Sequence, residues 1–123
     1  MVQTFFFDTY ALVEISKGNP KYENYKSDIR ILLNKLNIME YSLFLIREGR
    51  KEKLSEVFDE LSNFNIDYDN EILIKAAEMK NKYKKEKLSF IDCIGYLLAI
   101  KNNAKFLTGD EKFKDKNNVE FVK

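Results

Sequence analysis

Short apolar segments alternate along this chain with longer stretches in which apolar residues recur at helical spacing. Short apolar runs are typical of buried strands, whereas recurrence every three or four residues is typical of amphipathic helices. We predict strands at residues 3–7, 36–38, 64–66, 105–107 and 119–122. We predict helices at residues 10–17, 21–33, 39–49, 51–63, 72–83 and 91–101.

Strands that alternate with helices in this way predict an α/β layer fold with a mainly parallel sheet. The length of 123 residues fits one domain over residues 1–123, long enough to bury a single core. Pro20 suits the first turn of a helix, Asp67 or Asp69 can cap the helix that follows, and Ser89 can cap the most apolar helix of the chain.

The composition excludes several kinds of chemistry. The chain has no histidine, which removes Ser-His-Asp and Cys-His catalytic groups and the common histidine-bearing zinc sites. Its single cysteine, Cys93, suits a reducing compartment and a small buried position rather than a nucleophile. The net charge of +1 gives no overall attraction to nucleic acid, so an RNA partner needs a local basic patch.

The chain also lacks the sequence features of a membrane protein. No stretch reaches the roughly 18 to 20 apolar residues that span a bilayer. Residues 1–4 lack the basic start of a signal peptide. We therefore expect a cytoplasmic protein with no membrane partner.

Four acidic residues occupy positions that a parallel sheet would bring together, namely Asp8, Glu40, Asp92 and Asp110. Asp8 and Asp110 each follow a predicted strand. Glu40 lies at the start of the helix that follows the predicted strand 36–38, and Asp92 lies in the first turn of the most apolar helix. Ligands of open parallel sheets bind beyond the carboxyl ends of the strands. Because ionised carboxylates near a core need a hydrogen bond or a cation, the four form a candidate metal site.

The chemistry that such a cluster suits is metal-dependent cleavage of phosphodiester bonds. Mg²⁺ and Mn²⁺ prefer oxygen ligands, and Mg²⁺ is typically bound by carboxylates together with a substrate phosphate. The ion lowers the pKa of water, orients it for in-line attack and neutralises the leaving oxygen. Histidine is not needed for this chemistry.

Four segments that together cover nearly the whole chain resemble the PIN-domain ribonucleases, and the compact size resembles the VapC-type toxins of toxin–antitoxin pairs. They are Phe5-Phe6-Phe7-Asp8-Thr9, Asn37-Ile38-Met39-Glu40-Tyr41, Ser89-Phe90-Ile91-Asp92-Cys93-Ile94 and Leu107-Thr108-Gly109-Asp110-Glu111-Lys112-Phe113. The chain departs from the family pattern at Gly109, where a basic or polar residue is frequent, and at Cys93, where alanine is frequent. The resemblance implies a PIN-like three-layer fold, with a short, mainly parallel central sheet flanked by helices.

The resemblance also implies a function. It implies a Mg²⁺- or Mn²⁺-dependent endoribonuclease, the toxin of a toxin–antitoxin system, in which the four acidic residues bind the metal and perform catalysis. It implies an RNA substrate, a cognate antitoxin that covers the acidic pocket, and a homodimer as the common assembly. The residues expected to support the acidic cluster are Thr9, Ser89 and Thr108.

Each acidic residue also has a plain structural interpretation. Asp8 and Asp110 can cap the helical turns that follow them, and Glu40 can offset a helix dipole. Asp92 can pair with Ser89 in a capping box. For Asp8, capping and metal binding are compatible.

The basic run from Lys80 to Lys87 allows two interpretations. It is a solvated helix end, or it follows an RNA backbone beside the acidic site, with Tyr83 available for stacking. Lys112 is close to Asp110 in sequence and can approach a phosphate. The candidate RNA-binding residues are Lys82, Lys84, Lys85, Lys87 and Lys112.

Two other functions stay open from the sequence. One is a non-catalytic PIN-like module that binds RNA or a protein. The other is a receiver-like phosphoacceptor domain, which also gathers aspartates at strand ends. A receiver normally has adjacent acidic residues after its first strand, whereas here Phe6 and Phe7 precede Asp8.

Overall fold

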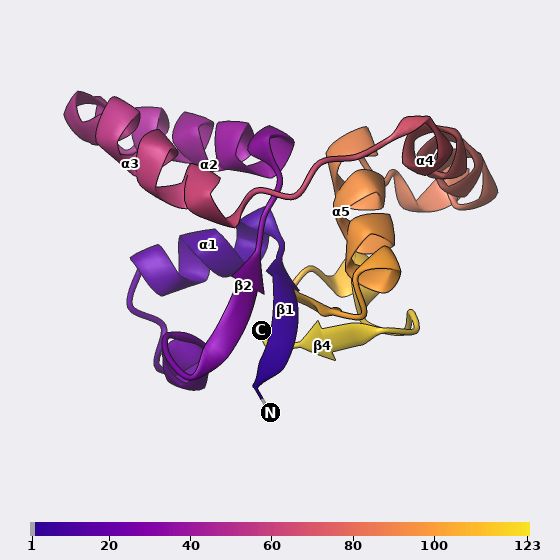
Figure 1. The fold of residues 1–123 in the computed structure, drawn as a ribbon, viewed down its shortest axis with the longest axis horizontal. Coiled ribbons are helices and arrows are strands. Elements are labelled where there is room, and N and C mark those ends of the chain that lie inside the picture. Colours follow the sequence, from indigo (N-terminus) through magenta and orange to yellow (C-terminus); the bar gives the residue numbers. More distant parts are fainter. Residues whose placement is uncertain (1) are drawn as a thin grey trace.

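The computed structural model describes residues 2–123, and within them four parallel strands form a sheet in the order β2-β1-β3-β4 (Figure 1). The strands are β1 (Gln3–Phe7), β2 (Ile29–Leu32), β3 (Lys105–Thr108) and β4 (Val119–Phe121). The helices are α1 (Thr9–Ser16), α2 (Lys35–Arg47), α3 (Leu54–Leu61), α4 (Asn70–Lys82) and α5 (Phe90–Lys101), and the short 3-10 helices are η1 (Pro20–Tyr25), η2 (Lys51–Lys53), η3 (Ser62–Phe64), η4 (Lys84–Glu86) and η5 (Glu111–Phe113). Across residues 2–123, no helix has both the length and the apolar character needed to cross a membrane.

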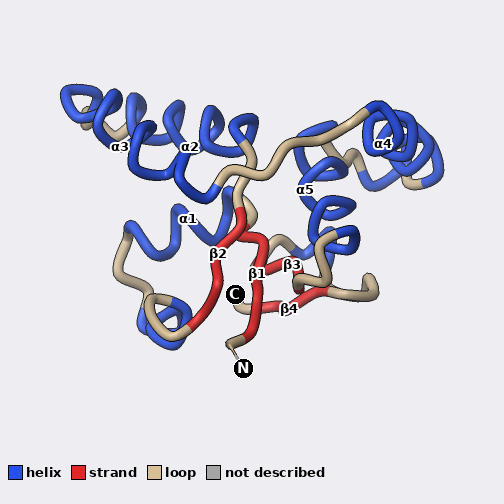
Figure 2. The backbone as a smooth tube through the Cα atoms, in the orientation of Figure 1, coloured by secondary structure: helices blue, strands red, loops and turns tan. Residues whose placement is uncertain are grey.

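Alternating side chains of β1 divide the core into two layers. Phe6 packs with Phe106, their ring centroids 6.1 Å apart, and with apolar residues of α4 and α5. Phe5 and Phe7 pack on the opposite face with residues of α1 and α2, because successive side chains of a strand point to opposite faces. Figure 2 shows the same division, with α1 to α3 on one side of the strands and α4 and α5 on the other. The predicted three-layer α/β fold is confirmed.

Polar caps determine where three of the helices begin. Asn34 and Asn37 form a capping box at the start of α2, in which the Asn34 backbone N–H donates to Asn37 Oδ1 over 2.8 Å. Asp69 caps α4, and Ser89 forms a capping box with Asp92 at the start of α5. Each such cap stabilises its helix by about 1 kcal/mol. The predicted capping roles of Asp69 and Ser89 are confirmed.

Several predicted elements are wrong. Residues 36–38 lie inside α2 rather than in a strand, because the capping box at Asn34 starts the helix before them. Residues 29–32 form the edge strand β2 rather than the end of a helix, since Asp28 has a positive φ of 59° that interrupts helical geometry. The segment 64–66 forms no regular strand, and Asn65 makes one isolated parallel bridge to Leu33, directly after β2. The predicted helix 51–63 is divided into η2, α3 and η3.

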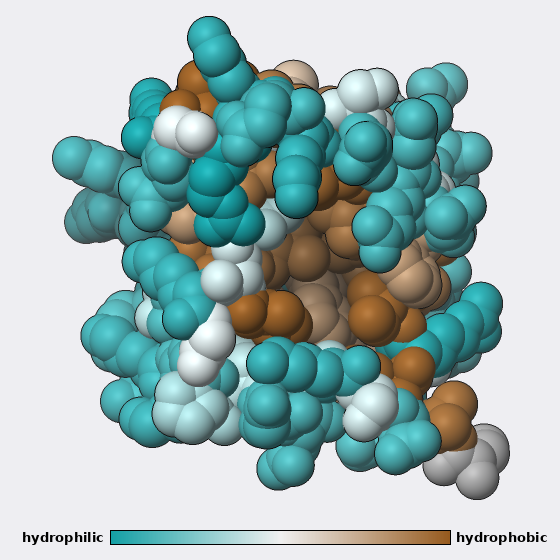
Figure 3. All heavy atoms as spheres, turned by 90° about the vertical axis from the view of Figure 1, so that its left-hand side faces the viewer, coloured by the Kyte–Doolittle hydropathy of each residue, from teal (hydrophilic) through white to brown (hydrophobic). Residues whose placement is uncertain are grey.

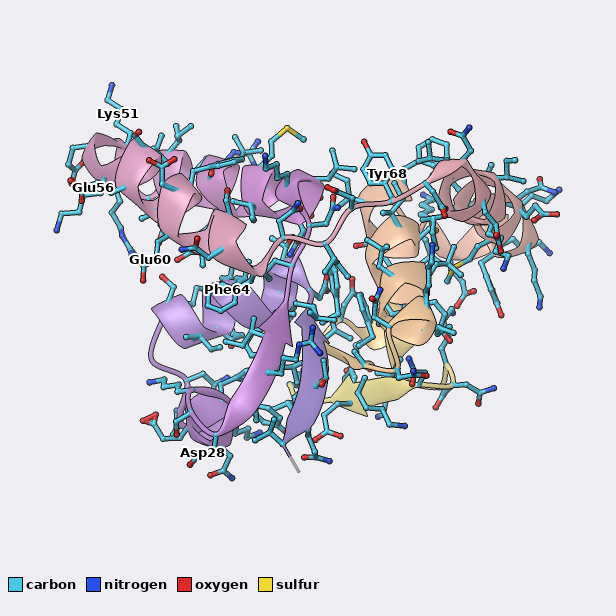
Figure 4. The ribbon with its side chains drawn as sticks, viewed as in Figure 1. Asp28, Lys51, Glu56, Glu60, Phe64 and Tyr68 are labelled. Atoms are coloured by element: carbon cyan, nitrogen blue, oxygen red, sulfur yellow. The ribbon has the colours of Figure 1, made fainter. Side chains whose placement is uncertain are left out.

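The surface beside β2 contains a shallow apolar hollow of about 200 Å³. Viewed from the side, it is a hydrophobic depression ringed by hydrophilic side chains (Figure 3). Its walls include Ile15, Ile31, Leu61 and Phe64. Figure 4 shows Phe64 beside β2, with Glu60 on the neighbouring edge of α3. Among the described residues that line this hollow there is no carboxylate, so the acidic chemistry predicted from the sequence belongs elsewhere.

Candidate functional site: an acidic cleft at the carboxyl edge of the sheet

A cleft of about 540 Å³ opens at the carboxyl ends of β1 and β3, and all four acidic residues predicted from the sequence line it. Asp8 directly follows β1 and Asp110 follows β3, and these strands are neighbours in the sheet. Glu40 comes from the second turn of α2, and Asp92 comes from the first turn of α5. The parallel sheet therefore brings together acidic side chains that are far apart in the sequence.

Asp8 is the most buried of the four, with 6% of its surface exposed. It precedes α1 but makes no side-chain cap, and its Oδ2 instead accepts a hydrogen bond of 2.7 Å from Thr108 Oγ1. Burial raises the pKa of Asp8 to about 7, the negative charges of Asp92 and Glu40 add to the rise, and the hydrogen bond from Thr108 opposes it. A carboxyl group whose pKa is raised by burial and by nearby like charges is typical of functional sites.

Hydrogen bonds also hold Glu40 and Asp92. Thr9 Oγ1 donates to Glu40 Oε1 over 2.6 Å. The Ser89 backbone N–H donates to Asp92 Oδ2 over 3.1 Å, and the Asp92 backbone N–H donates to Ser89 Oγ over 3.0 Å. Burial raises the pKa of both carboxyl groups, and the charge of Asp92 adds to the rise at Glu40. The capping interpretation of Asp92 is therefore confirmed, and its carboxylate also lines the cleft.

Asp110 is linked to Asp8 through Thr108. The Asp110 backbone N–H donates to Thr108 Oγ1 over 3.0 Å, and the same hydroxyl donates to Asp8. Asp110 Oδ1 accepts from the backbone N–H of Lys112 over 3.0 Å, so the residue also caps η5. Each predicted supporting residue thus contacts an acidic residue of the cleft: Thr108 contacts Asp8, Thr9 contacts Glu40 and Ser89 contacts Asp92.

The donor atoms suit a hard divalent cation. Carboxylate oxygens are the ligands that Mg²⁺ and Mn²⁺ prefer, and these oxygens come from four elements around one cleft. Within residues 2–123, no three of these carboxylates form a preassembled metal-binding group. Burial is the main cause of the raised pKa of Asp8, repulsion from Asp92 and Glu40 adds to it, and a bound cation would relieve both. The residues therefore fit a metal by donor chemistry and by their shared cleft.

The cleft also contains two cationic residues that the sequence analysis missed. Lys17 follows α1 and Arg47 ends α2, and both line the cleft together with Tyr10 and Phe44. Lys17 lies seven positions after Tyr10, and Arg47 lies seven after Glu40. Seven residues are about two helical turns, so this spacing places each pair on one side of its helix. That spacing was the one sequence signal that could have identified them.

The predicted RNA-binding lysines lie apart from these cations. Lys82 ends α4, Lys84 and Lys85 lie in η4, and Lys87 follows, and none of them is among the described residues that line the cleft. Lys112 connects this run to the site, because its Nζ donates to the Lys87 carbonyl oxygen over 3.3 Å. The pKa of Asp92, raised by burial, is partly lowered again by hydrogen bonds from Ser89 and by the charge of Lys112.

Gly109 allows the loop after β3 to pass close to its neighbours. A Cβ atom at this position would collide with the Tyr10 ring and with the backbone carbonyl of Val122. Only glycine therefore fits here without a shift of backbone. This contact explains why the chain has no side chain at a position where the PIN-domain pattern frequently has a polar or basic one.

By its three-layer fold and by the acidic residues at the carboxyl edge of its parallel sheet, this chain is an α/β domain with a candidate metal site. The sequence itself gives the family: residues 5–119 match the PIN domain. The chain belongs to the PIN-domain family, as its four segments predicted. No curated protein matches the sequence.

Solved structures share the same fold. A toxin–antitoxin complex from Klebsiella pneumoniae matches with a TM-score of 0.73 and 18% identity, over 94% of this chain and 94% of that chain. VapBC2 from Rickettsia felis, bound to a DNA fragment from its promoter, matches with a TM-score of 0.71 and 18% identity, over 98% of each chain. A protein from Pyrobaculum aerophilum matches with a TM-score of 0.66 and 16% identity, over 99% of this chain and 92% of that chain. At these identities the likeness establishes the fold.

Proposed function

We propose that this PIN-domain protein is a metal-dependent endoribonuclease and the toxin of a toxin–antitoxin pair. The observation that carries the proposal is the convergence of four carboxylates, from four elements, on one cleft at the carboxyl edge of the sheet. Burying like charges is costly, and a domain that only binds a partner gains nothing from that cost. Cleavage of a phosphodiester with Mg²⁺ or Mn²⁺ uses this arrangement directly.

In this proposal the chain's own residues hold the donors and organise the substrate. A bound divalent cation supplies charge neutralisation at the phosphate and a lowered pKa of water. Asp8 presents an oxygen from the floor of the cleft, fixed by Thr108, and Glu40 presents one fixed by Thr9. Asp92 and Asp110 complete the acidic set from α5 and the loop after β3. Lys112, whose charge lowers the pKa of Asp92, is the proposed partner of a phosphate oxygen.

The partners follow from the same proposal. Two of the similar structures are described as toxin–antitoxin or VapBC assemblies, which supports a cognate antitoxin for this chain. A homodimer is the assembly that the family resemblance implies. RNA is the proposed substrate, and the basic run with Lys82, Lys84, Lys85 and Lys87 is the proposed outer track for its backbone. The cytoplasm is the proposed compartment, consistent with a single buried, unpaired cysteine.

The test is cleavage of a mixed RNA pool by the protein after any co-purified partner has been removed. Reactions contain Mg²⁺, Mn²⁺ or a chelator, with single-stranded DNA as a parallel substrate. Asp8→Asn and Asp92→Asn remove charge from the cleft, and Asp59→Asn is the matched control, because Asp59 is exposed on α3 outside the cleft.

We expect metal-dependent cleavage of RNA that both cleft substitutions abolish and the control retains. Cleavage that survives both substitutions would remove the acidic cleft from the reaction. Absence of cleavage, together with no Mg²⁺ or Mn²⁺ binding by calorimetry, would favour a non-catalytic binding module instead.

A further inference from the structure

The acidic cleft continues between α1 and α2 beyond the carboxylates, and apolar and then charged side chains line this extension. The α1 side offers Val13, Glu14 and then Lys17, and the α2 side offers Leu43, Phe44 and then Arg47. Lys17 lies four residues after Val13, and Arg47 lies four residues after Leu43 and three after Phe44, so each set lies along one helix face. Glu40 and Arg47 are seven residues apart, which is about 10 Å along α2. The cleft thus changes from acidic to apolar to cationic over roughly two helical turns.

The apolar middle presents an aromatic ring in a fixed orientation. Phe44 stacks on the ring of Tyr41, a buried residue, with centroids 6.0 Å apart and planes inclined by 20°. Leu43 beside it is 45% exposed, which leaves apolar surface open inside a polar cleft. A flat, fixed ring next to exposed apolar surface is the kind of site on which an unpaired base stacks.

The cationic end is free to bind an anion. Lys17 Nζ lies 5.9 Å from the centre of the Phe44 ring, and its contact with Glu14 is long, at 3.9 Å. Glu14 is itself occupied, because it accepts a hydrogen bond of 2.9 Å from Asn19 Nδ2. Within residues 2–123, Arg47 has no carboxylate partner within salt-bridge distance. An incoming base can displace the exposed Lys17 side chain, which then remains in reach of the adjacent phosphate.

We propose that this extension is a nucleotide subsite for single-stranded RNA, in which Phe44 stacks on the base beside the scissile phosphate and Lys17 and Arg47 bind the next phosphate. The inference rests on the proposed nuclease function and adds to it the residues that position the substrate. The cleft offers acidic, aromatic and cationic groups in that order. An RNA strand offers a phosphate for the metal site, then a base for the ring, then the next phosphate for the cations, so the two orders match. An apolar peptide would fill the middle of the cleft but would leave both cations without partners.

The test measures RNA affinity separately from cleavage. A short fluorescein-labelled single-stranded RNA of mixed sequence is titrated with Asp92→Asn protein in chelator, by fluorescence anisotropy at several salt concentrations. We expect Phe44→Leu to weaken binding about tenfold without changing the salt dependence, and Phe44→Tyr to retain affinity. We expect Lys17→Gln and Arg47→Gln each to reduce the slope of log K against log salt by about 0.7.

Matched controls and the kinetics separate this inference from the function on which it rests. Phe58→Leu and Arg30→Gln change the same residue types outside the cleft and should leave RNA affinity unchanged. In the otherwise native sequence, Phe44→Leu should raise KM while kcat stays within about twofold. If the protein cuts RNA but these variants bind it like their parent, the subsite assignment fails and the nuclease function stands. If no form of the protein cuts or binds RNA, both the subsite and the nuclease function fail. If Phe44→Leu still binds RNA but no longer binds a protein partner, the subsite belongs to that partner.

Discussion

The two ends of the cleft between α1 and α2 have opposite charge and are built in opposite ways. At the acidic end, Asp8 is 6% exposed and hydrogen-bonded to Thr108, a residue of the central sheet. At the cationic end, the Lys17 side chain is 57% exposed, and its single ion pair is long. Asp8 is therefore positioned by the core, whereas Lys17 and Arg47 are exposed side chains at the ends of α1 and α2.

This difference separates the expected effects of substitutions. Changing a buried, hydrogen-bonded carboxylate alters both the chemistry of the site and the stability of the fold. Changing an exposed cation alters the affinity for an anion and its salt dependence, and leaves the fold intact. Removing a buried charge at the acidic end should thus lower activity while it relieves a cost to stability, whereas removing an exposed cation should change substrate affinity and leave stability unchanged.

The largest expected effect is on cleavage at the acidic end. Asp8→Asn removes one charge from the proposed metal site, and we expect kcat to fall about a thousandfold, or roughly 4 kcal/mol in activation free energy. The same substitution should not destabilise the metal-free protein at pH 8, because it relieves a buried charge. Single-turnover cleavage and urea unfolding of the same preparation measure the two quantities. A variant that loses both activity and stability would break the comparison.

The next effect is the pH dependence of stability. Burial, together with Asp92 and Glu40, raises the pKa of Asp8 from 3.8 to about 7. The folded state therefore binds a proton that the unfolded state has released. The stabilisation from protonated Asp8 is complete below pH 4 and is lost as the pH rises to about 7. Linkage gives roughly 4 kcal/mol as an upper value for this loss.

The measurement for this prediction is urea unfolding between pH 4 and pH 8 in chelator. Asp8→Asn should flatten the profile between pH 4 and pH 7, because the substitution removes the titrating group. Asp59→Asn, on the exposed side of α3, should retain the profile of the native sequence. An equal slope in Asp8→Asn and the native sequence would assign the pH dependence to other carboxyl groups.

A smaller effect concerns the packing that shapes the acidic end. Gly109→Ala places a methyl group against the Tyr10 ring and the Val122 carbonyl, and we expect a loss of about 2 kcal/mol in the free energy of unfolding. Gly18→Ala is the matched control, since Gly18 has a positive φ of 75° but no atom within 4 Å of the added Cβ. Backbone strain alone should cost it about 1 kcal/mol. Thermal unfolding that ranks Gly18→Ala as the worse variant would show that the contact at Gly109 is easily relieved.

The sequence predicted the acidic end because its signals are local and strong. A single acidic residue after a strand is common, but four of them at positions that parallel strands bring to one edge form an informative combination. The cationic end gave no comparable signal, since Lys17 and Arg47 are two of 21 basic residues and both are exposed. Only the arrangement of α1 against α2 makes these two different from the rest.

Strand β2 was not predicted for a similar physical reason. Ile29 and Leu32 continue the spacing of Tyr22 and Tyr25, so the whole segment fits one amphipathic helix. The chain instead ends η1 at Tyr25 and turns at Asp28, and the next residues pair with β1. Strand pairing is a tertiary interaction that overrides local helical spacing, and spacing alone could not predict it.

The smallest expected effect concerns the basic run, which lies outside the cleft. Replacing Lys82, Lys84, Lys85 and Lys87 together by glutamine should raise KM for RNA severalfold at low salt and leave kcat unchanged, because exposed cations act on encounter more than on chemistry. The effect should disappear at high salt, whereas the effect of Phe44→Leu should persist. Cleavage assays at two salt concentrations compare the two variants. A larger loss from the lysine substitutions than from Lys17→Gln and Arg47→Gln would move the main phosphate contact out of the cleft and onto η4, and the cationic end would then serve no substrate.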